Sequence, residues 1–185
     1  MVIIEYNLVM NLFHNFWFIQ VIGAIALIFI VLAWNAKNRK NIFILQSVNL
    51  AFFIVHYLLL SAYAGAAMCT VVLARNFVFM HKTEKKWASH IAWLYGFIIV
   101  AIGVLIIFWN GWVTILPVLG VVISMYAMWK DKPAQMRFFM LMSCIVWIPY
   151  TLIVQSWPGL FSQIIGVIGI LVGMYRLDRN NKSYL

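Results

Sequence analysis

The chain has 185 residues, of which 66% are hydrophobic and only 9% are charged, and its formal net charge is +9. A soluble domain carries about 25% charged residues, so this composition excludes an ordinary globular protein and indicates one polytopic membrane domain over residues 1–185. A net charge of this size would suggest nucleic-acid binding in a soluble protein. Here the basic residues lie in short links between apolar runs, so we expect the lipid bilayer as a partner and no nucleic acid.

Seven apolar segments are long enough, or nearly so, to cross a bilayer, which takes about 20 helical residues. They cover residues 14–34, 42–60, 64–80, 90–109, 112–129, 136–154 and 159–176. The pattern predicts an all-α membrane protein with seven transmembrane helices. The residues before the first span include Glu5 and no lysine or arginine, so we expect no cleaved signal peptide. Cys69 and Cys144 fall inside predicted spans, which favours buried free thiols over a disulfide.

The links between these segments alternate in charge. Links 61–63, 110–111 and 155–158 contain no lysine or arginine. The other three links and the C-terminal end hold three basic residues each: Lys37, Arg39 and Lys40; Lys82, Lys85 and Lys86; Lys130, Lys132 and Arg137; Arg176, Arg179 and Lys182. Twelve of the thirteen basic residues therefore share one side, and the positive-inside rule predicts a cytoplasmic C-terminus and an N-terminus outside. Termini on opposite sides of the membrane require an odd number of spans, and seven spans meet this requirement.

Polar residues interrupt the apolar spans of the first half. The first span contains Gln20, and the second contains Gln46, Asn49 and His56. At about 100° per residue, the three polar groups of the second span lie within roughly 80° of one another on the helical wheel. Hydrocarbon cannot hydrogen-bond such groups, so we expect them to face protein, water or a ligand. The alternative is interhelical hydrogen bonding, which contributes about 1 kcal/mol or less per bond in membranes.

The third span contains Arg75 and Asn76, and no acidic residue lies in any predicted span to pair with the arginine. One interpretation is a counter-charge for an anionic solute, and another is a gate latch that bonds to neighbouring asparagine or glutamine side chains. The alternatives are a side chain that reaches lipid phosphate and a structural tie to backbone carbonyls. In the second half, the candidates for lining a solute path are Ser143, Trp147, Tyr150 and Gln163.

The rhythm of the links predicts two three-helix repeats joined by a linker helix. Repeat one covers about 14–80, the linker helix about 90–109 and repeat two about 112–176. A shift of 94 positions aligns Asn49 with Ser143, Phe53 with Trp147, His56 with Tyr150 and Gly65 with Gly159. A shift of 97 aligns Gly23 with Gly120 and Gln20 with Pro117. Because three helices separate two equally oriented units, an axis along the membrane normal would relate them and place the matched faces opposite each other.

Four stretches of the sequence resemble the YgjV family of bacterial inner-membrane proteins. They are the Arg75–Asn76 pair, the run 56–59, the segment 112–117 and the segment 173–176. The resemblance extends over about residues 23–178 and implies an inner-membrane location but no activity. The predicted 3+1+3 arrangement is also similar in architecture to the SWEET sugar facilitators and the PnuC vitamin transporters. The proline-glutamine and proline-asparagine pairs of SWEET proteins are missing from the first and fifth spans.

The function that these features favour is a small-solute transporter or facilitator that works by alternating access between two three-helix units. Its substrate would be a small polar or ring-containing solute. The alternative is a non-transporting membrane protein, such as a partner subunit, an assembly factor or a lipid-binding structural protein. We expect no enzymatic activity, no metal and no cofactor, because the sequence contains no paired-carboxylate, phosphate-loop, nucleophile-elbow or zinc-ligand pattern. A homo-oligomer is a further expectation.

Overall fold

The structure is a computed structural model that describes residues 2–35, 39–82, 84–130 and 133–178. These residues are helical or lie in turns, and no strand occurs among them. The α-helices are α1 (Val2–Asn35), α2 (Arg39–Leu59), α3 (Tyr63–Met80), α4 (Ala92–Ile107), α5 (Ile115–Trp129), α6 (Pro133–Ile153) and α7 (Trp157–Gly173). A short 3-10 helix, η1 (Trp112–Thr114), precedes α5, and a π-helical turn, η2 (Met174–Asp178), follows α7. The predicted all-α class is confirmed.

Within the described ranges, five helical segments have the length and apolar composition of a membrane span: Asn15–Ala33, Tyr63–Met80, Trp112–Trp129, Ala134–Ile153 and Trp157–Arg176. The apolar helices Phe43–Leu59 and Ala92–Ile107 are shorter. A helix of about 16 residues is roughly 24 Å long, whereas the hydrocarbon core is about 30 Å thick. The five long segments establish the multi-pass character. That α2 and α4 also cross the membrane stays a prediction.

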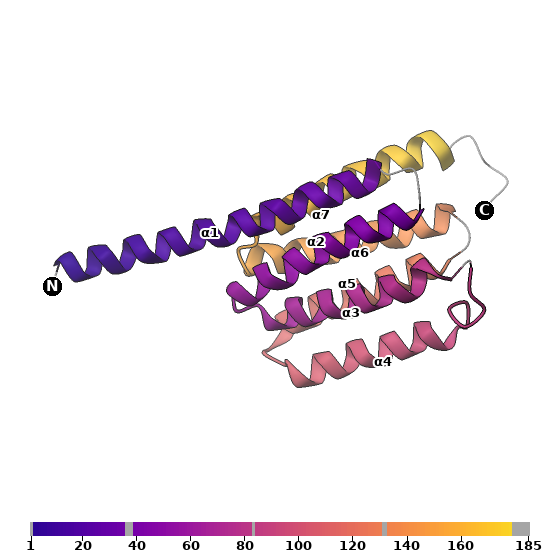
Figure 1. The fold of residues 1–185 in the computed structure, drawn as a ribbon, viewed down its shortest axis with the longest axis horizontal. Coiled ribbons are helices and arrows are strands. Elements are labelled where there is room, and N and C mark those ends of the chain that lie inside the picture. The colour runs from indigo at the N-terminus through magenta and orange to yellow at the C-terminus, as the bar shows by residue number, and fades with distance from the viewer. Residues whose placement is uncertain (1, 36–38, 83, 131–132, 179–185) are drawn as a thin grey trace.

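Helix α1 is longer than its predicted span. It begins at Val2 instead of residue 14 because no glycine or proline interrupts the residues that precede the span. Its N-terminal part projects beyond the other helices, as Figure 1 shows at the indigo end of the ribbon.

Neighbour relations among six helices form a closed ring. Helix α1 packs against α2 and α7, α2 against α3, α3 against α5, α5 against α6, and α6 against α7. Helix α4 packs against α3 and α5, at the edge of the bundle opposite α1 and α7 (Figure 1). Each of the trios α1–α3 and α5–α7 therefore packs in sequence order, and the two trios meet through the pairs α1–α7 and α3–α5.

Two tight turns connect α2 to α3 and α6 to α7. In each, one non-glycine residue has a left-handed backbone: Ser61 has φ 55° and Gln155 has φ 54°. The following N–H reaches back five residues, from Ala62 to the Tyr57 carbonyl at 2.8 Å and from Ser156 to the Thr151 carbonyl at 2.9 Å. This is the Schellman pattern that ends a helix by satisfying its last carbonyls. The corresponding residues of the two turns are 94 positions apart.

The other end of the bundle carries the basic links. The ends of α1, α3, α5 and α7 lie together at this end of the bundle (Figure 1). By the helix bounds, the described basic residues Lys40, Lys82, Lys130 and Arg176 lie close to these helix ends or to the starts of the helices that follow. Lys82 donates a hydrogen bond to the Trp129 carbonyl at 3.0 Å and lies 4.2 Å from the centre of the Trp129 ring. The basic end and the two tight turns thus occupy opposite ends of the bundle.

Candidate functional site

A partly open cavity of about 200 Å³ lies between the two trios of helices. Helices α2, α3, α5, α6 and α7 form most of its wall, and Ile30 of α1 completes it. Seven of the ten candidate residues from the sequence line this one cavity: Gln46, Asn49, Arg75, Asn76, Ser143, Trp147 and Gln163. Hydroxyl groups from Ser124 and Ser162 and thiols from Cys69 and Cys144 also line it. The structure therefore brings polar groups from both halves of the chain together.

Two polar side chains of the wall hold neighbouring helices through backbone carbonyls. The Asn49 side-chain amide donates to the Ala26 carbonyl at 2.7 Å, which joins α2 to α1. The Ser143 hydroxyl donates to the Gly120 carbonyl at 2.8 Å, which joins α6 to α5. These carbonyls already accept helical hydrogen bonds, and their second lone pair takes the extra donor. The Asn49 amide nitrogen and the Ser143 hydroxyl therefore make the interhelical hydrogen bonds of the alternative interpretation, although both residues also line the cavity.

Arg75 is buried inside the bundle with 5% of its surface exposed. Its guanidinium donates to the Ser124 hydroxyl at 3.1 Å and to the Asn76 side-chain oxygen at 3.0 Å, and it lies 5.6 Å from the centre of the Phe79 ring. Among the described residues, Nε of Arg75 and Nδ2 of Asn76 have no hydrogen-bond partner. Both of these hydrogen bonds go to side chains that line the cavity, and neither goes to a backbone carbonyl.

Aromatic rings form the wall of the cavity on the side of the tight turns. Phe53 and Tyr57 of α2 stack with their ring centres 5.7 Å apart, and Tyr57 stacks on Trp147 of α6 at 6.4 Å. All three rings line the cavity. Because Tyr57 and Trp147 come from different trios, their contact closes the space between the trios at this depth.

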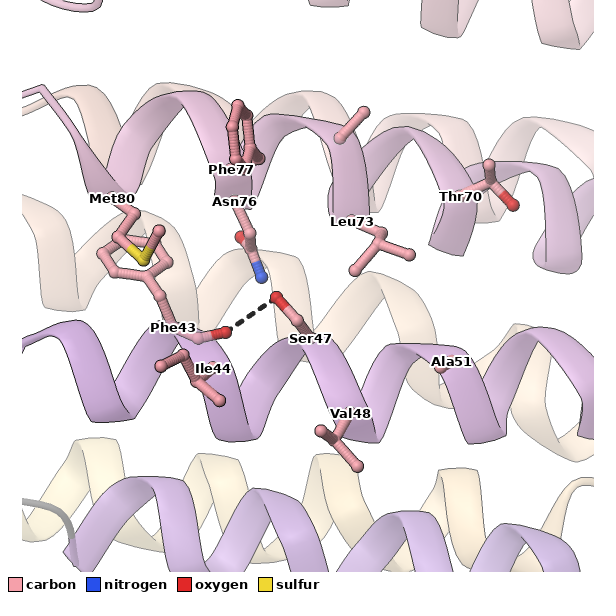
Figure 2. Close-up of a pocket in the computed structure, with 11 residues that line it drawn as sticks. Phe43, Ile44, Ser47, Val48, Ala51, Thr70, Leu73, Asn76, Phe77 and Met80 are labelled. Carbon is pink, nitrogen blue, oxygen red and sulfur yellow. Dashed lines mark hydrogen bonds between the residues drawn. The ribbon is translucent and has the colours of Figure 1, made fainter.

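An open groove of about 700 Å³ lies outside the bundle between α2 and α3. Its lining is mainly apolar, with Ser47, Thr70 and Asn76 as the polar residues (Figure 2). Figure 2 shows the Asn76 amide nitrogen directed across the groove toward Ser47, whose hydroxyl donates to the Phe43 carbonyl at 2.7 Å. Asn76 lines both the groove and the cavity, so its side chain lies between them.

A family model for bacterial inner membrane proteins, Imp-YgjV, matches residues 17–181. The chain belongs to the Imp-YgjV family. This confirms the resemblance seen in the sequence and, with the long apolar helices, establishes a multi-pass protein of the bacterial inner membrane. No curated protein and no solved structure matches the chain. The architectural likeness to SWEET and PnuC transporters stays a prediction.

Three candidate residues of this Imp-YgjV protein lie outside the cavity, near the tight turns. Nδ1 of His56 donates to the Ile19 carbonyl at 2.8 Å, so Nε2 of the neutral ring accepts from the Ser156 hydroxyl at 2.8 Å. The Gln20 side chain donates to the Gln155 carbonyl at 3.0 Å. These bonds join α1, α2 and the α6–α7 turn. His56 and Gln20 therefore lie outside the cavity, whereas the sequence predicts that they line the solute path.

The Tyr150 side chain, the third of these residues, is also used in packing. It is buried against Gly65 of α3, whose backbone hydrogen-bonds to the Tyr150 hydroxyl. Tyr150 also contacts Tyr57 with the ring centres 6.0 Å apart. Sequence reasoning missed several lining residues, because serine and cysteine are common in helix packing and carry no distinctive pattern; these are Ser124, Ser162, Cys69 and Cys144. Within the part of the chain that the structure describes, no group of three or more His, Cys, Asp or Glu could hold a metal ion.

Ser156→Ala is expected to lower the free energy of unfolding by about 1–3 kcal/mol. The substitution leaves Nε2 of the buried His56 ring without its partner, and an unsatisfied buried polar group carries this penalty. The measurement is thermal or denaturant unfolding of the purified protein in detergent. Ser89→Ala is the matched control, because the Ser89 hydroxyl donates to the Lys86 carbonyl on the exposed surface. Equal stability of both variants would contradict the assigned hydrogen bond.

Proposed function

We propose that this Imp-YgjV protein is a small-solute transporter that works by alternating access between the units α1–α3 and α5–α7. The observation that carries the proposal is the pairing of residues around the cavity. Seven pairs of lining residues are 94 positions apart in the sequence: Ile30 and Ser124, Gln46 and Met140, Asn49 and Ser143, Leu50 and Cys144, Phe53 and Trp147, Cys69 and Gln163, and Val72 and Gly166. A cavity lined by equivalent positions of two repeats is where transporters of this kind bind substrate.

Hydrogen bonds in the two halves support the same correspondence. The Asn49 bond to Ala26 and the Ser143 bond to Gly120 are equivalent under a shift of 94, as are the two tight turns. The predicted shift of 97 for the first and fifth spans is therefore not supported, since Ala26 and not Gly23 corresponds to Gly120. One shift of 94 suffices for both repeats.

The proposed transport cycle is a rocking of one trio against the other around the cavity. Each trio packs in sequence order, and the trios meet through the pairs α1–α7 and α3–α5. Rocking about an axis in the membrane plane, at the level of the cavity, would separate the Tyr57 ring from the Trp147 ring and open the cavity on one side of the membrane. By the positive-inside rule the basic end of the bundle faces the cytoplasm, which puts the tight turns and the N-terminus on the outer side.

The proposal is tested by solute flux into liposomes that contain the purified protein. A panel of small polar and ring-containing solutes is compared with protein-free liposomes, and at least one solute is expected to enter faster. Gln46→Leu is expected to reduce that flux about tenfold, a loss of about 1.4 kcal/mol, because a wall amide is replaced by an apolar side chain. Gln135→Leu, an exposed residue of α6, is the matched control. Equal flux with and without protein for every solute would overturn the proposal.

The two cysteines give an independent prediction, because Cys69 and Cys144 line the cavity and are the protein's only cysteines. A protein that alternates is expected to expose them to water, so a membrane-impermeant thiol reagent should label them and inhibit flux. Mass spectrometry of the labelled protein checks this, with the Cys69→Ala, Cys144→Ala double variant as the control. The alternative, a non-transporting protein with a dry interior, predicts no labelling in the folded state. Homo-oligomer formation and the lack of an enzymatic reaction stay predictions.

A further inference from the structure

The cavity contains a buried positive charge without an acidic partner. Helices α2 to α7 contain no aspartate or glutamate, and none of the residues that line the cavity is acidic. Arg75 keeps its charge when it is buried, because arginine is not deprotonated in proteins. An unpaired buried charge strongly destabilises the folded state. The most direct compensation for this charge is an anion that enters the cavity.

A hydrogen-bond donor of this charged group has unused capacity. The Nε of Arg75 has no partner among the described residues, although 95% of the surface of this residue is buried. The guanidinium is fixed by Ser124 and Asn76, so its planar fork is held in one orientation. A guanidinium recognises the oxygen atoms of a carboxylate or phosphate through such donors.

The rest of the wall favours an organic ligand. The side chains of Phe53, Tyr57 and Trp147 form an aromatic surface on the side of the cavity toward the tight turns, whereas Arg75 lies nearer the basic end, in the last two turns of α3. A solute with an anionic group at one end and an apolar or ring portion at the other would match both surfaces. A cationic solute would meet no acidic partner here.

We propose that the cavity binds a small organic anion, with Arg75 as the residue that recognises its anionic group. This inference names the substrate class of the proposed transporter and so rests on the proposed function, but binding can be measured without transport. Arg75 is a binding residue in this scheme, and Ser124 and Asn76 are positioning residues that orient its guanidinium.

The test compares acids with their neutral amides on the purified full chain in phosphatidylcholine nanodiscs. The pairs are benzoate with benzamide, nicotinate with nicotinamide, and succinate with succinamide, and binding is measured by calorimetry and by the shift of the thermal unfolding midpoint. At least one acid is expected to bind about tenfold or more tightly than its amide, since the amide lacks the charge that pairs with Arg75. Equal binding of acid and amide, or no binding of any acid, would overturn the proposal.

Variants identify the residue responsible. Arg75→Gln is expected to weaken binding of that acid about tenfold or more, and Arg75→Lys less, because lysine keeps the charge but loses the planar fork. Arg176→Gln removes an exposed arginine outside the cavity and should bind the acid like the original chain. Undiminished binding by Arg75→Gln would overturn the assignment. If that variant does not fold, the comparison of acid with amide on the original chain still decides.

Two further arms separate the sources of the anion and the two proposals. Phosphatidylglycerol added to the nanodiscs should leave the affinity for the acid unchanged, and competition by this lipid would overturn the assignment to a soluble anion. Acid binding without flux of any solute would support the anion site and overturn the transporter. Flux of neutral solutes by a protein that binds no acid would support the transporter and overturn the anion site.

Discussion

Gly65→Ala is expected to lower the free energy of unfolding by about 1–3 kcal/mol, the usual cost of overpacking a close contact. A Cβ at this position would overlap the Tyr150 hydroxyl, and the ring atoms behind it are 3.0 and 3.1 Å away. Tyr150 has little freedom to move, because its ring is buried and contacts Tyr57 and Trp147. The measurement is denaturant unfolding of the purified protein in detergent.

A double-substitution cycle identifies the cause of that loss. Tyr150→Phe removes the hydroxyl and its hydrogen bond to Gly65, which should cost about 1 kcal/mol alone. In the Gly65→Ala background the same change should recover part of the lost stability, because the atom with the closest overlap is gone while the ring atoms remain. Gly96→Ala is the matched control, since a Cβ there meets no atom within 4 Å and alanine favours a helix over glycine. Additive losses in the cycle would contradict the predicted overlap.

The sequence allows the polar wall of the cavity to be predicted, for a simple physical reason. Amide and guanidinium groups are costly in hydrocarbon, and helical periodicity puts Gln46 and Asn49 on one face. Alignment of the two halves then points to Ser143 and Trp147 as the groups across from them. All four line the cavity, and their prediction needed only helix geometry and the predicted repeat.

Depth along the helix axis is the part that periodicity does not determine. His56 shares the face of Asn49, but seven residues separate them, which is about 10 Å along the helix. At that depth the α6–α7 turn brings Ser156 against His56, so the imidazole is taken up by this contact, and of the two neighbouring residues only Tyr57 lines the cavity. The position of this turn depends on the packing of α7 against α1 and α6, which a single sequence does not reveal. The same reason accounts for Gln20, whose partner is the Gln155 carbonyl of that turn.

Substitutions of Arg75 and Asn76 can show whether the pair has a functional or a structural role, because the two roles predict different changes in the stability of the protein. Arg75→Met alone is expected to destabilise the protein by about 1–3 kcal/mol, because the buried Asn76 oxygen loses its donor. Ser124 is not affected in this way, since its hydroxyl also donates to the Val121 carbonyl at 2.8 Å. The cost of the single substitution thus arises from the remaining partner and not from loss of the charge itself.

Replacing both residues, as Arg75→Met with Asn76→Leu, is expected to restore or exceed the original stability while abolishing solute flux. Apolar side chains of similar volume often stabilise a protein when they replace a buried ionic group, by about 1–4 kcal/mol, because no charge has to be desolvated. Thermal unfolding in nanodiscs and flux into liposomes measure the two effects on the same preparations. A chain that becomes more stable without the pair has retained it for binding and not for folding. A double variant that unfolds would instead assign the pair a structural role and favour the non-transporting alternative.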